Sequence, residues 1–255
     1  MTAVEQTAVT ARRATLTHAD AMRLARDEYL RFADAVASLD GDDWTTPTEC
    51  AGWTVHDLVA HVVGMSTMAS SPLENVRQTR AARKRLRPGR QLVDAVTAYQ
   101  VERFGQQTTD QLVRSMAAIA PKAAAARGRT PRLLRNRTIP EQQLVNGAAE
   151  RWTIGYAIDT ILTRDPWMHR IDLARATGHA LVLTEEHDGA IVADVVQEWA
   201  ARHGMPYNLR LTGAAGGRWH CGTTDERLDL DAIEFCRILA GRAEGAGLLT
   251  IQVPF

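Results

Sequence analysis

The stretch Thr163–Gly178, with the sequence TRDPWMHRIDLARATG, is the segment on which the interpretation of this chain depends. On a helix, residues four apart lie above one another, so Asp165 and His169 share a face and Asp172 follows one turn later. A carboxylate and an imidazole at this spacing are two donors for a divalent metal, because zinc accepts oxygen and nitrogen ligands together. The same spacing also occurs on solvated helix faces, where Asp165 would be a cap ahead of Pro166. Both interpretations are open at this point.

A second stretch, Gly52–Gly64, has the sequence GWTVHDLVAHVVG and carries a full set of helix-start signals. Thr54 is the expected N-cap and Asp57, three residues on, is its capping-box partner. The apolar residues of this helix form one stripe, and His61 lies at the edge of that stripe, facing the boundary of the core. A histidine in such a position is either a satisfied boundary residue or a ligand.

Together these two stretches resemble the mycothiol-dependent maleylpyruvate isomerase family, within the wider DinB-like metalloenzyme group. The resemblance rests on Gly-Trp-Thr followed by Leu-Val-Ala-His61, and on Arg-Asp165 followed by His169-Arg-Ile-Asp172-Leu. It covers most of the chain. It implies a metal site whose ligands are His61, Asp165 and His169.

Asp165 stands where the family pattern has glutamate. Aspartate is shorter by one methylene, so it reaches a metal only if the backbone comes closer or the carboxylate binds in another mode. Pro166 removes an amide donor and is expected to start or kink the helix. Asp165 is therefore either a ligand in a slightly altered site or only a helix cap.

The hydrophobic pattern predicts a mainly α protein, a four-helix bundle over residues 1–180 followed by a small α+β domain over residues 181–255, and the resemblance implies that the bundle is DinB-like. Helices are expected at 17–39, from residue 54 onward, at 91–116, and at 141–178 with an interruption at Pro166. Residues 121–140 hold three prolines and are expected to be irregular or lightly helical. The C-terminal part is expected to contain helices at 185–203 and 231–241, and strands at 208–212, 218–221 and 248–253.

Charge and composition limit the classes of partner. The 255 residues carry 30 basic and 30 acidic side chains, so the formal net charge is zero and no bulk attraction to nucleic acid or an anionic membrane is expected. Residues 77–90 form a dense basic run, but they lack interleaved aromatic residues, which favours a solvated face over a nucleic-acid or phosphate site. The expected partners are a small-molecule substrate and a low-molecular-weight thiol.

Three cysteines without a CxxC spacing predict no disulfide framework, and no long apolar run or signal pattern is present, so a cytoplasmic protein is expected. Cys50 lies close before the His61 helix. It is expected to be either a small buried hydrophobe or a neighbour of the site.

The expected chemistry follows from three protein ligands, because such a zinc site keeps a fourth position for a reactant, and a thiol bound there loses its proton. Zinc or another divalent metal is the expected cofactor. The resemblance implies mycothiol as the thiol and cis-trans isomerisation of maleylpyruvate as the reaction, with thiol transfer to a small electrophile left open. The alternative is a non-catalytic metal- or ligand-binding DinB-like protein.

Two further residues are assigned roles. Asp172 is either a surface charge or a carboxylate that orients the His169 imidazole from outside the ligand set. The resemblance implies an arginine that binds the substrate carboxylate, a role that suits a guanidinium. Arg242 is the candidate for it, with Arg210, Arg218 and Arg237 as competitors.

Overall fold

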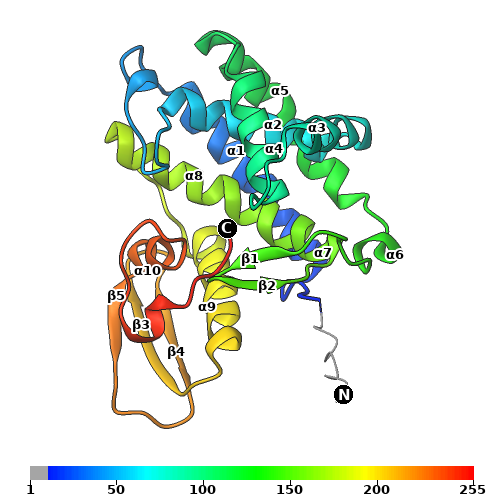
Figure 1. The fold of residues 1–255 in the computed structure, drawn as a ribbon. Helices are drawn as coiled ribbons and strands as arrows, with labels where there is room; N and C mark the ends of the chain where they lie inside the picture. Colours follow the sequence, from blue (N-terminus) through cyan, green and yellow to red (C-terminus); the bar gives the residue numbers. More distant parts are fainter. Residues whose placement is uncertain (1–10) are drawn as a thin grey trace, which may run out of the picture.

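The computed structural model of the protein describes residues 11–255, and most of them are helical (Figure 1). The N-terminal helices are α1 (His18–Ala37), α2 (Val55–Ser70), α3 (Pro72–Arg85), α4 (Leu92–Phe104), α5 (Thr109–Gly128) and α6 (Arg132–Arg135). A hairpin of β1 (Gln143–Val145) and β2 (Ala148–Glu150) then leads into α7 (Ile154–Tyr156) and α8 (Leu162–Thr177). The mainly α class is confirmed. Within the described residues, no helix is both long and apolar enough to cross a membrane.

The bundle is built on α1, α2, α5 and α8, with α1 packed against α5 and α8, and α2 packed against α4, α5 and α8. The helix start predicted at Thr54 is confirmed, because the Thr54 side chain accepts a hydrogen bond from the Asp57 N–H and Asp57 accepts one from the Thr54 N–H at 3.0 Å. This capping box fixes where α2 begins and so which of its faces turns inward. The core of the bundle includes Tyr29, Phe32, Leu58, Val62, Leu112 and Met116.

The C-terminal part is a small α+β unit whose elements are α9 (Ala190–His203), β3 (Tyr207–Thr212), β4 (Gly217–Cys221), β5 (Leu228–Asp231) and α10 (Ala232–Leu239). The sheet has the order β4-β3-β5, with β3 antiparallel to β4 and parallel to β5. Its core joins Trp199 of α9 and Phe235 of α10 to Leu24 of α1 and Trp167 of α8. Because this core crosses residue 180, the division into two domains at that point stays a proposal.

One prediction about the middle of the chain is wrong. The helix predicted at 91–116 is two helices, α4 and α5, separated by a turn after Gly105. Thr108 and Gln111 form a capping box that starts α5, with Gln111 Oε1 accepting from the Thr108 N–H at 2.8 Å. The segment 121–140, expected to be irregular or lightly helical, is partly helical, because α5 continues through Pro121 to Gly128 and the short α6 follows.

The prediction of a helix over 141–178 is wrong for its first third. Asn146 and Gly147 both have positive φ, 53° and 75°, and they form the two-residue turn of the β1–β2 hairpin. Asn-Gly is a strong hairpin signal because both positions of such a turn need the left-handed region. Helical structure begins only at α7, and a π-helical segment, Ala157–Ile161, connects it to α8.

Pro166 lies inside α8 and does not end it. A proline at this position leaves the carbonyl of Leu162 without its usual amide donor. Arg127 of α5 fills that role, since its Nη1 donates to the Leu162 carbonyl at 2.8 Å and its Nη2 donates to the carbonyl of Ile158. The ligand-bearing helix therefore continues past Pro166 without a break.

The last predicted strand, at 248–253, is also wrong. Residues Gly247–Thr250 form a 3-10 helix, and Val253 meets the end of α10 through its N–H, which donates to the Leu239 carbonyl at 3.0 Å. The third strand of the sheet is β5 instead. The helices predicted at 17–39, 185–203 and 231–241 and the strands at 208–212 and 218–221 are confirmed within a few residues at their ends, with a π-helical first turn, Glu185–Gly189, ahead of α9.

Candidate metal centre

The three predicted ligands lie together, although they come from helices far apart in the sequence. His61 Nε2 of α2 is 3.5 Å from Asp165 Oδ1 of α8, and His169 Nε2 is 3.7 Å from the same oxygen. One donor atom from each of the three residues lies within 4.8 Å of the others. We call this group the ligand triad.

The donor atoms of the ligand triad fit a divalent metal. Two ligands bound to tetrahedral zinc at about 2.0–2.1 Å are separated by about 3.3–3.4 Å, close to the two separations measured here. Both imidazoles turn Nε2 toward the same carboxylate oxygen. On the other side of these two residues, Asp165 Oδ2 and His61 Nδ1 are buried and have no hydrogen-bond partner among the described residues.

Asp172 is fully buried and contacts the outer edge of the His169 ring, where Asp172 Oδ2 lies 3.0 Å from His169 Nδ1. Burial by itself raises the pKa of Asp172, but hydrogen bonds from His169 and Arg242 lower it to about 2. An ionised acceptor holds a proton of His169 on Nδ1, so that Nε2 is the nitrogen that faces Asp165 and becomes the ligand atom once its own proton is lost. The geometry thus fits the orienting role predicted for Asp172 rather than a surface charge.

The ligand triad holds a proton tightly in the metal-free protein. Burial by itself lowers the pKa of His169, but the Asp165 carboxylate and the bond to Asp172 raise it to about 10. The pKa of Asp165 moves in the opposite direction, because His169 and His61 outweigh the effect of burial. A metal that binds here displaces this proton.

Cys50 and Trp53 also lie beside the ligand triad. Cys50 is half-buried, with Sγ 3.5 Å from Asp172 Oδ2 and 3.8 Å from His169 Nδ1, so its interpretation as a buried hydrophobe is wrong. The Trp53 ring covers both imidazoles, with centroids 5.3 Å from His61 and 6.1 Å from His169. The sequence signal for both was their position directly before the Thr54 cap.

Cys50 and Trp53 belong to a loop, residues 46–53, that we call the strap. Glu49 at its centre accepts bonds from Arg237 of α10 at 2.9 and 2.7 Å and from Arg175 of α8 at 2.9 Å. These bonds lower the pKa of Glu49 against the effect of burial. The strap is therefore tied to the ligand helix and to the C-terminal unit at once.

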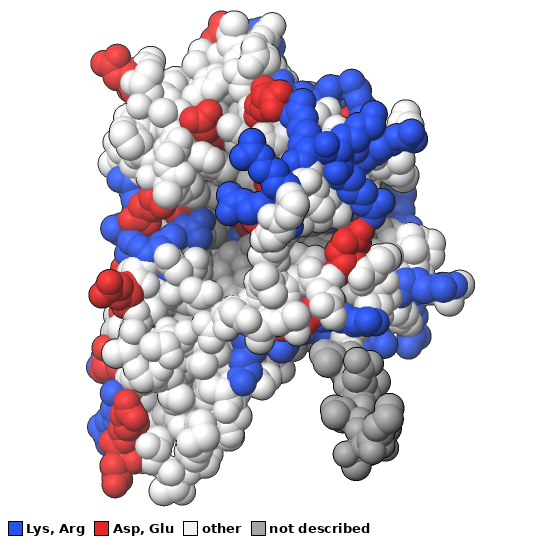
Figure 2. Space-filling view, in the orientation of Figure 1, with Lys and Arg blue, Asp and Glu red and all other residues white. Residues whose placement is uncertain are grey.

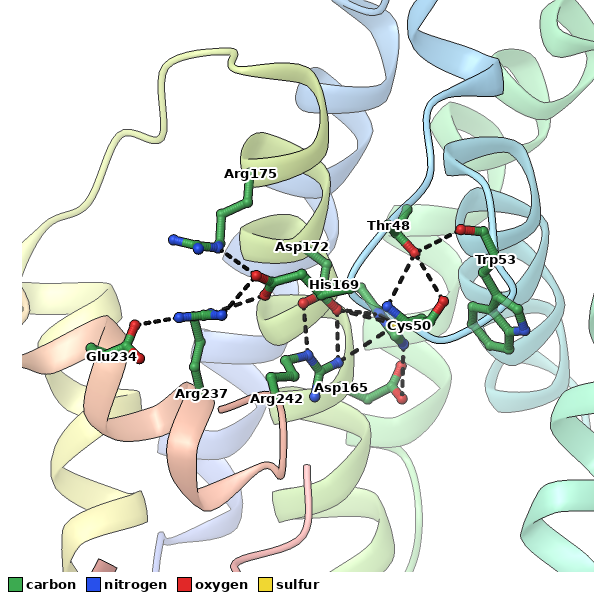
Figure 3. Close-up of polar contacts among 11 residues, drawn as sticks. Thr48, Cys50, Trp53, Asp165, His169, Asp172, Arg175, Glu234, Arg237 and Arg242 are labelled. Atoms are coloured by element: carbon green, nitrogen blue, oxygen red, sulfur yellow. Dashed lines mark hydrogen bonds and ion pairs between the residues drawn. The ribbon is translucent and has the colours of Figure 1, made fainter. Parts of the chain in front are cut away.

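Among the four arginine candidates, Arg242 is the one that contacts Asp172. Its Nε and Nη2 donate to the two carboxylate oxygens of Asp172 at 2.7 Å each (Figure 3). Arg210 instead pairs with Asp229 on the exposed side of the sheet, and Arg218 is exposed on β4. Arg242 thus lies beside the ligand triad with its bidentate edge bound to a protein carboxylate.

A family model described as the mycothiol maleylpyruvate isomerase N-terminal domain matches residues 25–174. The chain belongs to this family. The matched range contains the whole ligand triad and Asp172, and it ends before Arg242. No curated protein matches the chain.

Solved structures of the mycothiol-dependent maleylpyruvate isomerase extend the likeness in fold beyond that range. One has a TM-score of 0.54 at 16% identity and covers 94% of this chain and 95% of its own. A mutant of that isomerase, with a histidine replaced by alanine, has a TM-score of 0.54 at 15% identity, covering 89% and 90%. The DinB-like bundle followed by an α+β unit is therefore the fold of this isomerase family.

The basic run at 77–90 lies on α3 and the loop after it, and Figure 2 shows blue side chains gathered on that part of the surface. Several of these side chains form ion pairs with acidic neighbours, namely Arg77 with Glu74, Arg83 with Glu141, and Arg85 with Glu102. None of these residues belongs to the ligand triad or the strap. This arrangement is that of a solvated helix face.

Proposed function

We propose that this member of the isomerase family is a zinc-dependent enzyme that uses mycothiol as cosubstrate. Its ligands would be His61, Asp165 and His169, and zinc is the metal that best suits two imidazoles and one carboxylate. The observation that carries the proposal is the convergence of these three side chains on one point, with one oxygen of Asp165 facing both Nε2 atoms. The reaction would be cis-trans isomerisation of a small unsaturated acid such as maleylpyruvate.

The bound metal would supply Lewis-acid activation of a thiol, which is deprotonated when it is coordinated. The protein side chains shape the surroundings. Asp172 fixes the tautomer of His169, and Trp53 lies against both imidazoles, which keeps water from that side. Arg242 contributes a positive charge beside the reaction site, and the substrate-carboxylate role predicted for it remains part of this proposal.

Isomerisation and thiol transfer differ in what happens to the thiol. In isomerisation the thiolate adds to a conjugated double bond, the resulting single bond rotates, and the thiol leaves. In transfer the thiol stays on the electrophile. We propose isomerisation as the main activity because the family is that of an isomerase, and we include transfer in the test.

Two measurements test the proposal. The purified protein should bind close to one zinc per chain, and His61→Ala and His169→Ala should each lose most of it. His56→Ala is the matched control, because His56 lies on α2 but bonds the Gln107 carbonyl at 3.0 Å. Retention of zinc in both variants would refute the site.

The second measurement follows the products. The zinc-loaded protein is incubated with mycothiol and either maleylpyruvate or a generic electrophile such as a chlorinated dinitrobenzene. Formation of the trans isomer with unchanged mycothiol supports isomerisation, and loss of mycothiol into a conjugate supports transfer. Zinc binding without either product would instead support the non-catalytic metal-binding alternative.

A further inference from the structure

Below the ligand triad, inside the bundle, four helices bring polar side chains to one place. They are Tyr29 of α1, Ser66 of α2, Arg127 of α5, and the stretch of α8 around Asp165. Tyr29 and Ser66 are fully buried and Arg127 is 2% exposed. Buried polar groups at the centre of an apolar bundle are costly unless they serve one another or a ligand.

Two atoms at this place have no partner among the described residues, Asp165 Oδ2 and Ser66 Oγ. Asp165 directs its other oxygen at the two imidazoles. A carboxylate oxygen only accepts hydrogen bonds, whereas a serine hydroxyl also donates one. Of the two unpaired groups, the Ser66 hydroxyl can therefore act as a donor and Asp165 Oδ2 as an acceptor.

Tyr29 supplies a second donor. Its hydroxyl lies 3.7 Å from the sulfur of Met65, which is a weak acceptor, so the phenolic proton is available for a better one. Arg127 Nη1 donates to the Tyr29 oxygen at 3.2 Å, and such a bond polarises the hydroxyl and makes it a stronger donor. Arg127 itself is held by the carbonyls of Ile158 and Leu162.

The electrostatics agree with this geometry. Burial and the charge of Asp165 raise the pKa of Tyr29, whereas Arg127 and Ser66 lower it. The net effect is a raised pKa. The contacts of Tyr29 place it between the other two residues, since its hydroxyl meets Met65, the neighbour of Ser66, and Arg127 links it to the Leu162 carbonyl, one turn before Asp165. Tyr29, Ser66 and Asp165 Oδ2 offer three polar groups, within the two to four partners that an internal water needs.

We propose that Tyr29 and Ser66 form a buried support for Asp165 Oδ2, directly or through one ordered water, which holds the carboxylate with Oδ1 toward the two imidazoles. Tyr29 is then a positioning residue that acts through Asp165. The inference rests on the proposed metal-binding function.

The first test measures zinc affinity by competition with a chromophoric chelator. Tyr29→Phe should weaken binding by about tenfold, the size of effect seen when a partner behind a ligand is removed, and Ser66→Ala should weaken it less. Tyr99→Phe is the matched control, because Tyr99 lies on α4 and its hydroxyl accepts from Arg103 at 3.4 Å. Unchanged affinity in Tyr29→Phe would overturn the proposal.

A double-mutant comparison separates positioning from a general effect on folding. In an Asp165→Ala background, Tyr29→Phe should cause no further loss of zinc affinity, because the group that it positions is gone. An equal loss in both backgrounds would show that Tyr29 supports the fold and not Asp165.

The last test does not depend on zinc. A high-resolution crystal structure of the metal-free protein should show Asp165 Oδ2 bonded to Ser66 or Tyr29, or to one water that bonds them, and Tyr29→Phe should release this oxygen. Asp165 Oδ2 turned to any other partner would overturn the proposal. Failure of the wild-type protein to bind zinc would refute the proposed function. The crystal structure would then decide by itself whether Tyr29 and Ser66 hold Asp165 Oδ2.

Discussion

Arg242 donates two hydrogen bonds of 2.7 Å to Asp172, one to each carboxylate oxygen. Asp172 in turn accepts from Nδ1 of His169, so a residue of the C-terminal unit sets the orientation of an imidazole in the bundle. The C-terminal unit therefore contacts the surroundings of the ligand triad, even though every member of the triad comes from the bundle.

Replacing Arg242 by lysine should weaken zinc binding by about 10- to 100-fold. Lysine keeps the charge but loses the planar fork that holds both oxygens of Asp172. Chelator competition measures the effect, and Arg210→Lys, on the exposed pair with Asp229, serves as the control. A variant with wild-type zinc affinity and only a raised KM would show that Arg242 binds substrate and does not act through Asp172.

Zinc affinity should rise with pH. The raised pKa of His169, about 10, means that the metal-free protein carries a proton which zinc must displace at neutral pH. Each unit of pH between about 6 and 8 should therefore strengthen binding by about tenfold. The dissociation constant is measured in buffers that do not bind zinc. An affinity independent of pH would contradict the protonated state of His169.

Replacing Glu49 by glutamine should loosen the strap. The variant loses the ion pairs with Arg237 and Arg175, which hold the loop against α10 and α8. Cys50 should then react several-fold faster with a chromogenic disulfide reagent, measured in a Cys221→Ser background because Cys221 is exposed. Glu74→Gln removes an ion pair on α3 and should leave the rate unchanged. An unaltered rate in Glu49→Gln would show that other contacts hold the strap.

Replacing Arg127 by methionine should lower the free energy of unfolding by about 3 kcal/mol, because the carbonyls of Ile158 and Leu162 lose their buried donor. Adding Pro166→Ala should restore about 1 kcal/mol, since alanine has the N–H that bonds the Leu162 carbonyl in a regular helix. Urea unfolding measures both effects.

The control for this pair is Arg129→Met, on an exposed residue at the end of α5, which should change stability little. If Pro166→Ala gives no recovery in the Arg127→Met background, the role of Arg127 at the Leu162 carbonyl is wrong.

Local signals explain most of what could be predicted about the fold. The capping box at Thr54 and the cap at Asp231 each involve residues three apart, so they are legible without knowledge of any partner element. The hairpin at Asn146-Gly147 carried an equally local signal. The helix predicted over 141–178 runs across this turn, because the helical pattern of its later residues does not mark where the helix begins. The split between α4 and α5 also has a local signal, the capping box of Thr108 and Gln111.

The same distinction between local signals and packing applies to the candidate site. The spacing of Asp165 and His169 on one helix face was readable from the sequence, and so was Asp172 one turn later. Neither the rotation of Asp165, which leaves Oδ2 without a partner among the described residues, nor the place of Cys50 beside His169 can be read from the sequence. Both depend on how the strap and the helices pack.

The sequence by itself determined the helix that bears Asp165 and His169, the start of the helix that bears His61, and the family. The tertiary structure decided that His61 meets Asp165 across 104 positions and that Arg242 reaches Asp172 across 70. The physical reason is that caps and helix faces are set by neighbours in the chain. Which helix faces meet is set by the packing of side chains from the whole protein, and the sequence of one helix does not specify the helix against which it packs.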